Sequence, residues 1–197
     1  MVVPTIAGRE HWVERTTAKF EEFTAKPFEL LVLEDKELRG CGPVWQEGAD
    51  LAKGDYVFMA ADDLEPRALG WDEAAIAACD RGVLPAPLIF YPDGRLQSCG
   101  EHWEMLDGDG EETSFTRAPF VSRAQLAKVG RQLPTHYATD NWVSWKCWQA
   151  GIPTVVTYGF DLIHHLAPEG RNEGRMQADW QTFERATRGE DVWQESS

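Results

Sequence analysis

The first 80 residues constrain the fold most, because short apolar segments alternate there with segments of helical character. Residues 11–23 carry apolar side chains at helical spacing, and residues 42–54 begin near a proline and end at a glycine, as helices often do. Strand-like segments precede, separate and follow these two helices: residues 2–4, residues 28–33 and the run before Asp62. This β-α-β-α-β order predicts a parallel sheet with right-handed crossovers.

Each of the three predicted strands leads into polar residues. The pairs are Thr5 and Arg9, Glu34 and Asp35, and Asp62 and Asp63. Ligands of open α/β sheets bind beyond the carboxyl ends of the strands, so we expect one ligand to lie across these three ends. The adjacent carboxylates Asp62 and Asp63 suit a divalent cation that also holds a phosphate. The alternative is that they cap the following turn, a common use of aspartate.

The second half of the chain predicts mixed structure instead of a continued alternation. A hairpin is expected around Pro92-Asp93-Gly94, and the polar, glycine-containing residues 101–116 indicate a mobile surface loop. The other expected elements are helices at 71–79, 122–128, 141–150 and 176–187, a strand at 152–158 and a frayed tail at 188–197. We therefore expect one α/β domain over residues 1–187, with a first half at about 1–85 and a mixed half at about 86–170.

Composition disfavours several classes of function. Apolar residues make up 43% of the 197 residues, which is enough for a packed core. The net charge of −14 disfavours binding to nucleic acid or to an anionic membrane, since both attract basic residues. No apolar run approaches the ~20 residues of a membrane span, and the first residues lack the features of a signal peptide. The four cysteines stand far apart, which favours reduced, buried thiols in a cytoplasmic protein.

The order of these features resembles the family-two glycosyltransferases of the GT-A fold, over roughly residues 1–166. The segments that carry the resemblance are Pro4-Thr5 with Arg9, Leu33-Glu34-Asp35, residues 54–58 running into Asp62-Asp63, residues 120–130, Thr139-Asp140-Asn141-Trp142 and Gly151. A histidine one strand later, His164 or His165, completes the pattern. The chain departs from the family's metal motif at its first position, where Ala61 replaces the usual aspartate and leaves Asp62 and Asp63 to serve.

The resemblance implies a Rossmann-like, open, mostly parallel sheet flanked by helices. It also implies an enzyme that moves a sugar, with inversion, from a nucleotide-diphosphate donor to an acceptor hydroxyl. The donor would be a UDP-, GDP- or dTDP-sugar, the cofactor Mn²⁺ or Mg²⁺, and the acceptor a soluble protein or glycan.

The same resemblance assigns roles to the strand-end residues. Asp63 would bind the metal and Asp62 would face the ribose or a metal-bound water, beside Thr5 on the donor-binding strand. Glu34 and Asp35 would meet the nucleobase or ribose, unless they are a solvated loop pair. Arg9 would bind two diphosphate oxygens through its planar guanidinium, unless it is an ordinary surface arginine.

The two adjacent histidines cannot share one role. Neighbouring residues of an extended strand point to opposite faces, so only one of His164 and His165 can face the site. By resemblance that one would be a further metal ligand or a diphosphate contact. The alternative is a histidine satisfied by the backbone, and the sequence does not choose between the two positions.

On the acceptor side, Asp140 is the candidate general base, because an inverting transfer needs a carboxylate near the acceptor hydroxyl. Its place at a helix start also fits a capping residue. Trp103 and Trp142 would form an acceptor platform, since sugars pack their C–H faces on aromatic rings. Trp145 and Trp148 stand three residues apart, a spacing typical of a core.

Two other functions remain open from the sequence. One is a non-catalytic module that binds a sugar nucleotide or a glycan, in which Ala61 reflects the loss of metal-dependent catalysis. The other is a sugar nucleotidyltransferase, which is disfavoured because residues 5–9 are a poor version of a glycine-rich triphosphate loop.

Overall fold

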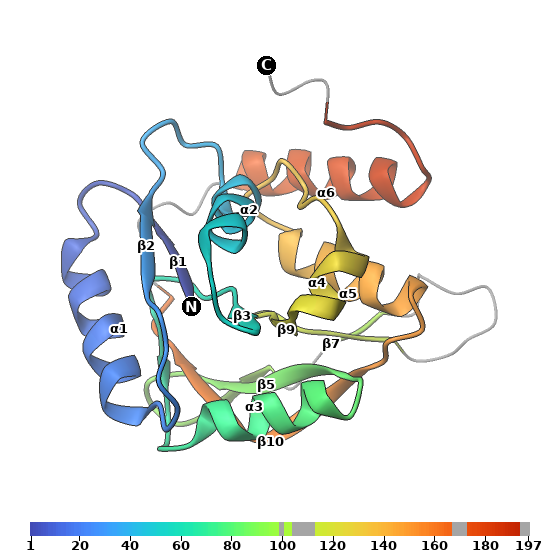
Figure 1. The fold of residues 1–197 in the computed structure, drawn as a ribbon. Helices are drawn as coiled ribbons and strands as arrows, with labels where there is room; N and C mark the ends of the chain where they lie inside the picture. The colour runs from blue at the N-terminus through green and yellow to red at the C-terminus, as the bar shows by residue number, and fades with distance from the viewer. Residues whose placement is uncertain (99–100, 104–112, 167–172, 194–197) are drawn as a thin grey trace.

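The computed structural model describes residues 1–98, 101–103, 113–166 and 173–193 (Figure 1). For residues 101–103, 113 and 114 the structure describes the backbone but not the side chains. The helices are α1 Glu10–Phe23, α2 Cys41–Leu51, α3 Trp71–Asp80, α4 Arg123–Val129, α5 Thr139–Gln149 and α6 Glu173–Thr187. The strands are β1 Val2–Thr5, β2 Leu31–Glu34, β3 Tyr56–Phe58, β4 Leu64–Pro66, β5 Leu84–Phe90, β6 Leu96–Ser98, β7 Glu101–Trp103, β8 Thr113–Phe115, β9 Phe120–Ser122 and β10 Thr154–His164.

The first half of the chain forms the predicted alternation. Strands β1 and β2 pair in parallel, with Thr5 opposite Glu34, and a parallel bridge from Val2 to Met59 brings the end of β3 beside β1. Helices α1 and α2 lie on opposite sides of the β1–β2 pair (Figure 1). A Cβ at Gly48 would lie 2.2 Å from a methyl carbon of Val2, so α2 sits directly on β1 because it presents a glycine there.

The sheet arrangement corrects the expectation of a mostly parallel sheet. Among the paired strands that the structure describes, only β1 with β2 and β5 with β10 are parallel. Strand β3 pairs antiparallel with β9, and β10 inserts between β5 and β4, running antiparallel to β4. The sequence pattern of the first half could not reveal these partners, because β9 and β10 come from the second half of the chain.

Several local predictions are confirmed. Strands β5 and β6 form the expected antiparallel hairpin. Ser122 caps α4 in a capping box: its hydroxyl accepts from the Gln125 backbone N–H, and the Gln125 side chain accepts from the Ser122 backbone N–H. Strand β10 is longer than the predicted 152–158 strand and carries the chain to His164, across an irregularity in its pairing between Val156 and Asp161.

Two segments differ from the prediction. The ends of the expected loop at 101–116 pair with each other as β7 and β8, and its centre at 104–112 lies outside the described residues. The tail was expected to fray from residue 188, but Val192 is buried and the Trp193 indole donates to the Gln132 carbonyl at 3.1 Å. Apolar side chains hold this part of the tail against the core, whereas 194–197 lie outside the described residues.

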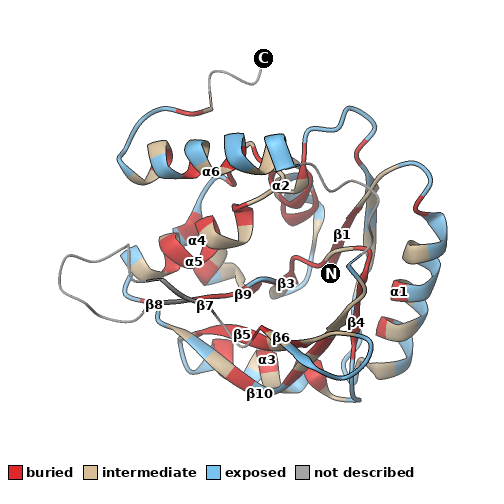
Figure 2. Cartoon of the chain, turned by 180° about the vertical axis from the view of Figure 1, so that it is seen from behind, coloured by how far each residue is buried: buried red, intermediate tan, exposed pale blue. Residues whose placement is uncertain are grey.

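Two hydrophobic clusters meet at β1, and Figure 2 shows buried residues concentrated between the elements. Val2 belongs to one cluster and Val3 to the other, because successive strand residues point to opposite faces. Each cluster draws residues from both halves of the chain; Trp45 and Trp142 share one, and Phe58 and Phe160 share the other. The strand ends that carry the candidate site therefore stand on a core common to both halves. No helix among the described residues is long and apolar enough to cross a membrane.

Candidate functional site

The predicted strand ends meet in one group, here called the strand-end cluster. It consists of Thr5, Arg9, Asp62, Asp63 and His164. Thr5 ends β1, Arg9 immediately precedes α1, the two aspartates follow β3, and His164 ends β10. The structure thus brings residues that follow the first and third predicted strands into contact, whereas the ligand expected across them stays a prediction.

Asp62 is held by partners on three sides. Its carboxylate accepts hydrogen bonds from Thr5 Oγ1 at 2.7 Å, from Arg9 Nε at 2.9 Å and from Arg9 Nη2 at 2.5 Å. The Thr16 hydroxyl donates to the Asp62 carbonyl at 2.6 Å. Burial raises the pKa of Asp62 above its ordinary value, although Arg9 and Thr5 both favour the charged form. Asp62 therefore fixes the guanidinium of Arg9 at the strand ends.

Asp63 faces His164 and not His165. Asp63 Oδ2 lies 3.5 Å from His164 Nε2 and 3.5 Å from Arg9 Nη2. The ring of His165 lies on the other side of the strand, where its Nε2 is 3.0 Å from Oε1 of Glu65, a buried carboxylate that Arg15 also binds. Only the backbone of His165 touches Asp63, through an N–H that donates to the Asp63 carbonyl at 3.0 Å.

The sequence reasoning missed Gln97, which orients His164. Gln97 Oε1 lies 3.2 Å from His164 Nδ1, within hydrogen-bond distance. A proton on Nδ1 donated to this carbonyl oxygen leaves the Nε2 lone pair directed toward Asp63. The available signal was a polar residue in the second strand of the predicted hairpin, but nothing in the sequence links that strand to β10.

Asp35 and Glu34 lie beside the cluster with different surroundings. The buried Asp35 carboxylate accepts from the backbone N–H of Arg39 at 3.0 Å and of Gly40 at 2.6 Å, which closes the turn before α2. Its own N–H donates to the Thr5 carbonyl at 2.7 Å. Glu34 is exposed, 3.7 Å from the Lys36 ammonium. Asp35 therefore shapes the loop next to β1, and Glu34 is free of the cluster's bonds.

Asp140 lies in the first turn of α5 but does not occupy its N-cap position. That position belongs to Ala138, whose φ of 60° puts it in the left-handed region, and it makes no side-chain capping bond. Asp140 Oδ1 accepts from the Asn141 N–H at 2.9 Å. Burial raises the pKa of Asp140 to about 6, against the opposing effects of that N–H and of the Arg117 charge. A carboxylate with this pKa can take up a proton near neutral pH.

Cys41 and His136 contact each other although they stand 95 residues apart in the sequence, and they were also missed. Cys41 begins α2, and its Sγ lies 3.3 Å from His136 Nδ1. Burial raises the pKa of Cys41 to about 12, and the charges of Asp140 and Asp62 add to the effect. Burial also lowers the pKa of His136. The neutral Cys41 thiol is therefore within electrostatic range of both the strand-end cluster and Asp140.

Trp142 is not placed to form its part of the predicted aromatic platform at this site. Trp142 is only 4% exposed, and its indole N–H donates to the Arg131 carbonyl at 2.9 Å. It follows Asp140 by two residues, so the two side chains point about 200° apart around the helix. The side chain of Trp103 lies outside the described part of the structure, which places only its backbone, in β7.

Asp63 and His164 together fit part of a metal-binding site. Among the residues described, no group of three or more His, Cys, Asp or Glu side chains is placed to hold a metal ion. Two ligand atoms on one ion lie about 3.0–3.4 Å apart when each bond is about 2.1 Å long and the angle is between a right angle and tetrahedral. The 3.5 Å between Asp63 Oδ2 and His164 Nε2 is close to that spacing. The pair can therefore supply two ligands, with the others left to a phosphate or water.

Comparison with solved structures identifies the fold. The chain superposes on GalNAc-T7 solved with UDP, GalNAc and Mn²⁺ (TM-score 0.67, 16% identity, 93% of this chain and 47% of that one). It also superposes on the mannosyltransferase PcManGT of Pyrobaculum calidifontis in complex with GDP-Man and Mn²⁺ (0.66, 14%, 95% and 63%). It superposes as well on TarS of S. aureus, with a TM-score of 0.60 and 14% identity, over 85% of this chain and 36% of that one.

These likenesses show that the chain has the α/β GT-A fold of glycosyltransferases. The chain spans less than two thirds of the length of each of the three proteins. No protein-family model matches the sequence, and no curated protein sequence does.

Proposed function

We propose that this chain is a metal-dependent, inverting glycosyltransferase of the family-two type, which moves a sugar from a nucleotide-diphosphate donor to an acceptor hydroxyl. The observation that carries the proposal is the meeting of Asp63, His164 and Arg9 at the strand ends of a GT-A fold. Ligands of open α/β sheets bind at this edge. A pair of metal-ligand atoms beside a fixed guanidinium suits a diphosphate.

On the donor side, Asp63 and His164 would hold the Mn²⁺ or Mg²⁺. A bound divalent cation would neutralise the charge that develops on the departing diphosphate. Arg9, fixed by Asp62, has its Nη2 near the same Asp63 oxygen and would meet the diphosphate from the α1 side. Thr5, Glu34 and Asp35 would line the nucleoside end of a UDP-, GDP- or dTDP-sugar, at the edge formed by β1 and β2.

On the acceptor side, Asp140 would act as the general base. With a pKa raised to about 6, its carboxylate is mainly ionised at neutral pH and can take the proton of the acceptor hydroxyl as the new bond forms. The acceptor would be a protein or a glycan. In this scheme residues 1–85 bind the donor together with His164, and the rest of residues 86–170 supply the acceptor side.

One observation favours a second candidate, a non-catalytic module that binds a sugar nucleotide or a glycan. Ala61 stands at the first position of the metal motif, and both Asp62 oxygens are already bonded to Arg9 and Thr5. Such a protein would bind the donor with little help from a metal and would transfer nothing.

Calorimetry with UDP-, GDP- and dTDP-sugars, with and without Mn²⁺, tests both candidates. We expect one donor to bind at least ten-fold more tightly with Mn²⁺, and Asp63→Ala and His164→Ala to remove that gain. Asp50→Ala, which changes an exposed carboxylate on α2, is the matched control. Absence of binding to all three donor classes, or an unchanged Mn²⁺ effect in Asp63→Ala, would refute the proposal. Tight binding with neither hydrolysis nor transfer would favour the binding module.

A further inference from the structure

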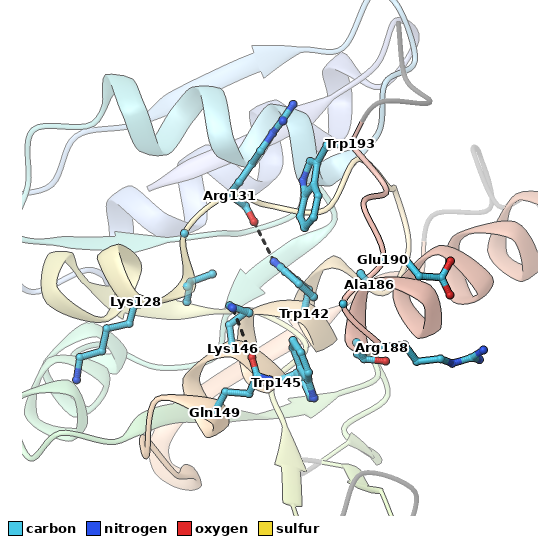
Figure 3. Close-up of a pocket in the computed structure, with 14 residues that line it drawn as sticks. Lys128, Arg131, Trp142, Trp145, Lys146, Gln149, Ala186, Arg188, Glu190 and Trp193 are labelled. Atoms are coloured by element: carbon cyan, nitrogen blue, oxygen red, sulfur yellow. Dashed lines mark hydrogen bonds between the residues drawn. The ribbon is translucent and has the colours of Figure 1, made fainter.

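A cavity lies on the far side of α5 from Asp140. This cavity, of about 590 Å³, is bounded by the end of α4, by α5, and by the end of α6 with the residues that follow it (Figure 3). Its volume falls within the range of small-molecule binding sites, about 300–1,000 Å³. We call it the tryptophan pocket, after Trp142, Trp145 and Trp193, which line it.

The three tryptophans pack against one another along one wall of the pocket, and Trp142 and Trp145 are largely buried there. Trp142 stacks on Trp145 with ring centroids 5.2 Å apart and an interplanar angle of 27°, and it meets Trp193 edge-on at 5.8 Å. The indole N–H groups of Trp142 and Trp193 donate to the carbonyls of Arg131 and Gln132. Because backbone carbonyls hold two of the rings, the wall is organised before any ligand binds.

The pocket is basic in an acidic protein. Four cationic side chains line it, Lys128, Arg131, Lys146 and Arg188, against the single carboxylate of Glu190, while the whole chain carries −14. Among the side chains that the structure describes, no carboxylate forms an ion pair with Lys128, Arg131 or Lys146. Lys146 Nζ instead lies over the rings of Trp142 and Trp145, 5.5 and 5.6 Å from their centroids.

We propose that the tryptophan pocket binds an anionic sugar unit. Ammonium and guanidinium groups without a carboxylate partner favour a negatively charged ligand, and the half-buried Trp193, unlike the buried Trp142 and Trp145, offers indole surface to a ligand with an apolar C–H face. An acidic saccharide combines both properties. The choice of a saccharide among anionic ligands rests on the proposed glycosyl transfer, in which the pocket would hold a unit of the acceptor away from the reacting hydroxyl.

The site is tested by titrating the whole chain with acidic and neutral tetrasaccharides, without nucleotide or metal. A hyaluronan tetrasaccharide supplies carboxylates, a chondroitin sulfate tetrasaccharide adds sulfates, and chitotetraose is the neutral control. Binding is followed by tryptophan fluorescence and by calorimetry. The test variant Lys128→Gln/Lys146→Gln is compared with Lys19→Gln/Lys53→Gln, which removes the same charge on α1 and after α2.

We expect at least one acidic tetrasaccharide to bind ten-fold or more tightly than chitotetraose, and the test variant, but not its control, to weaken that binding at least ten-fold. Equal binding of chitotetraose, equal effects of the two variants, or inorganic phosphate binding as tightly as the saccharides would overturn the proposal. Failure of the proposed function is seen separately, as absence of nucleotide-sugar binding. Saccharide binding in that case leaves the pocket standing.

Discussion

At the scale of single residues, Asp62 and Asp63 are adjacent but differ in what they can still bind. The Asp62 carboxylate is bonded to Arg9 and Thr5, so it orders the guanidinium and has little capacity for a ligand. Asp63 Oδ2 lies 3.5 Å from Arg9 Nη2 and 3.5 Å from His164 Nε2, and its spacing from the His164 nitrogen is close to that of two ligand atoms on one ion. Because its Oδ2 faces an imidazole nitrogen at this spacing, Asp63 is the better candidate for a metal ligand.

Gln97 gives a test of how His164 is oriented. Removing the partner of a metal-binding histidine's second nitrogen typically costs about 10–100-fold in metal affinity. We expect Gln97→Leu to weaken Mn²⁺ binding at least ten-fold, and Gln97→Glu, which keeps an acceptor oxygen, to preserve it. Gln181→Leu, on the exposed face of α6, is the control. Titration of Mn²⁺ by electron paramagnetic resonance, without nucleotide, makes the measurement, and equal affinities in all four proteins would remove Gln97 from the site.

The pKa of Asp140 predicts how transfer depends on pH. A general base acts in its ionised form, so with a pKa of about 6 the turnover rate should rise with pH and reach half its plateau near pH 6. Asp140→Asn should lose about 10²–10⁴-fold in rate at pH 7.5, with donor affinity unchanged. Rates at saturating donor and metal between pH 5 and about 8 supply the profile. A variant with near-normal turnover would show that Asp140 has only a structural role.

The same shift has a consequence for stability. The folded pKa of about 6 lies above the ordinary 3.8, so the ionised carboxylate is disfavoured in the folded state. The free-energy cost of burying the ionised carboxylate is fully present above the folded pKa. This cost vanishes at pH values below the ordinary pKa of 3.8. Asp140→Asn should therefore raise the melting temperature at pH 7.5 and leave it nearly unchanged at pH 3.5. A lower melting temperature at pH 7.5 would contradict the burial of this charge.

At this scale the sequence could predict which polar residues stand at the end of a strand. Thr5, Arg9, Asp62 and Asp63 were found because each follows an apolar run. The face taken by His164 depends on the register of β10 against β4, which pairs it with Leu64. Cys41, His136 and Gln97 approach the site from segments far apart in the chain, and no local pattern reports such contacts.

At the scale of elements, the helices were predictable from local signals in the sequence, whereas the strand partners were not. Periodicity located α1 and α6 to within a few residues, and an alanine-rich run located α3. Strand β3 could have continued a parallel sheet, but its edge accepts β9 from 60 residues later, which runs the other way. Polar residues at the strand ends thus predicted where the candidate site lies. The antiparallel strand pairs around it could not be predicted, because they join segments far apart in the sequence.

One contact between elements predicts a sharp effect of a single methyl group. The start of α2 lies against the loop before α5, and a Cβ at Gly42 would stand 1.9 Å from the Leu133 carbonyl oxygen and 3.1 Å from that of Thr135. Backbone on both sides leaves no flexible group to move, so Gly42→Ala should destabilise the fold by about 3 kcal/mol, the upper end for overpacking. Gly54→Ala meets nothing closer than 3.4 Å and should change stability by less than about 0.5 kcal/mol. Urea unfolding of both variants checks the contrast, and similar midpoints would show that the α2 start is not tightly held.

At the scale of the whole molecule, α6 connects parts of the site that are distant in sequence. Arg175 donates to the carbonyls of Leu38 and Arg39, in the turn that Asp35 closes. Asp179, one helical turn later, accepts from the backbone N–H groups of His136 and Tyr137. The helix near the end of the described chain thus joins the loop before α2 to the loop before α5, and these loops carry Cys41 and His136.

This role of α6 predicts that loss of Asp179 should loosen a loop 40 residues away. Asp179→Ala leaves two backbone N–H groups at His136 and Tyr137 without their acceptor, and each such group typically costs about 1–3 kcal/mol. We expect a total loss of roughly 2–4 kcal/mol, because water can reach part of this surface. Asp179→Asn keeps an acceptor oxygen and should lose less. Glu184→Ala, which removes an exposed pair with Arg188 on the same helix, should cost less than about 1 kcal/mol.

Urea unfolding gives the three free energies, and hydrogen exchange locates the change. Exchange should accelerate at residues 136 and 137 in Asp179→Ala, and also at 38–40, because Arg175 loses the carboxylate that lies 3.8 Å from its Nε. If Asp179→Ala were no less stable than Glu184→Ala, α6 would pack on the protein without stabilising the two loops. If only residues near 179 exchanged faster, its contacts would not hold the site loops. Coupled loosening of both loops would instead make α6 part of the framework that positions Cys41 and His136 against each other.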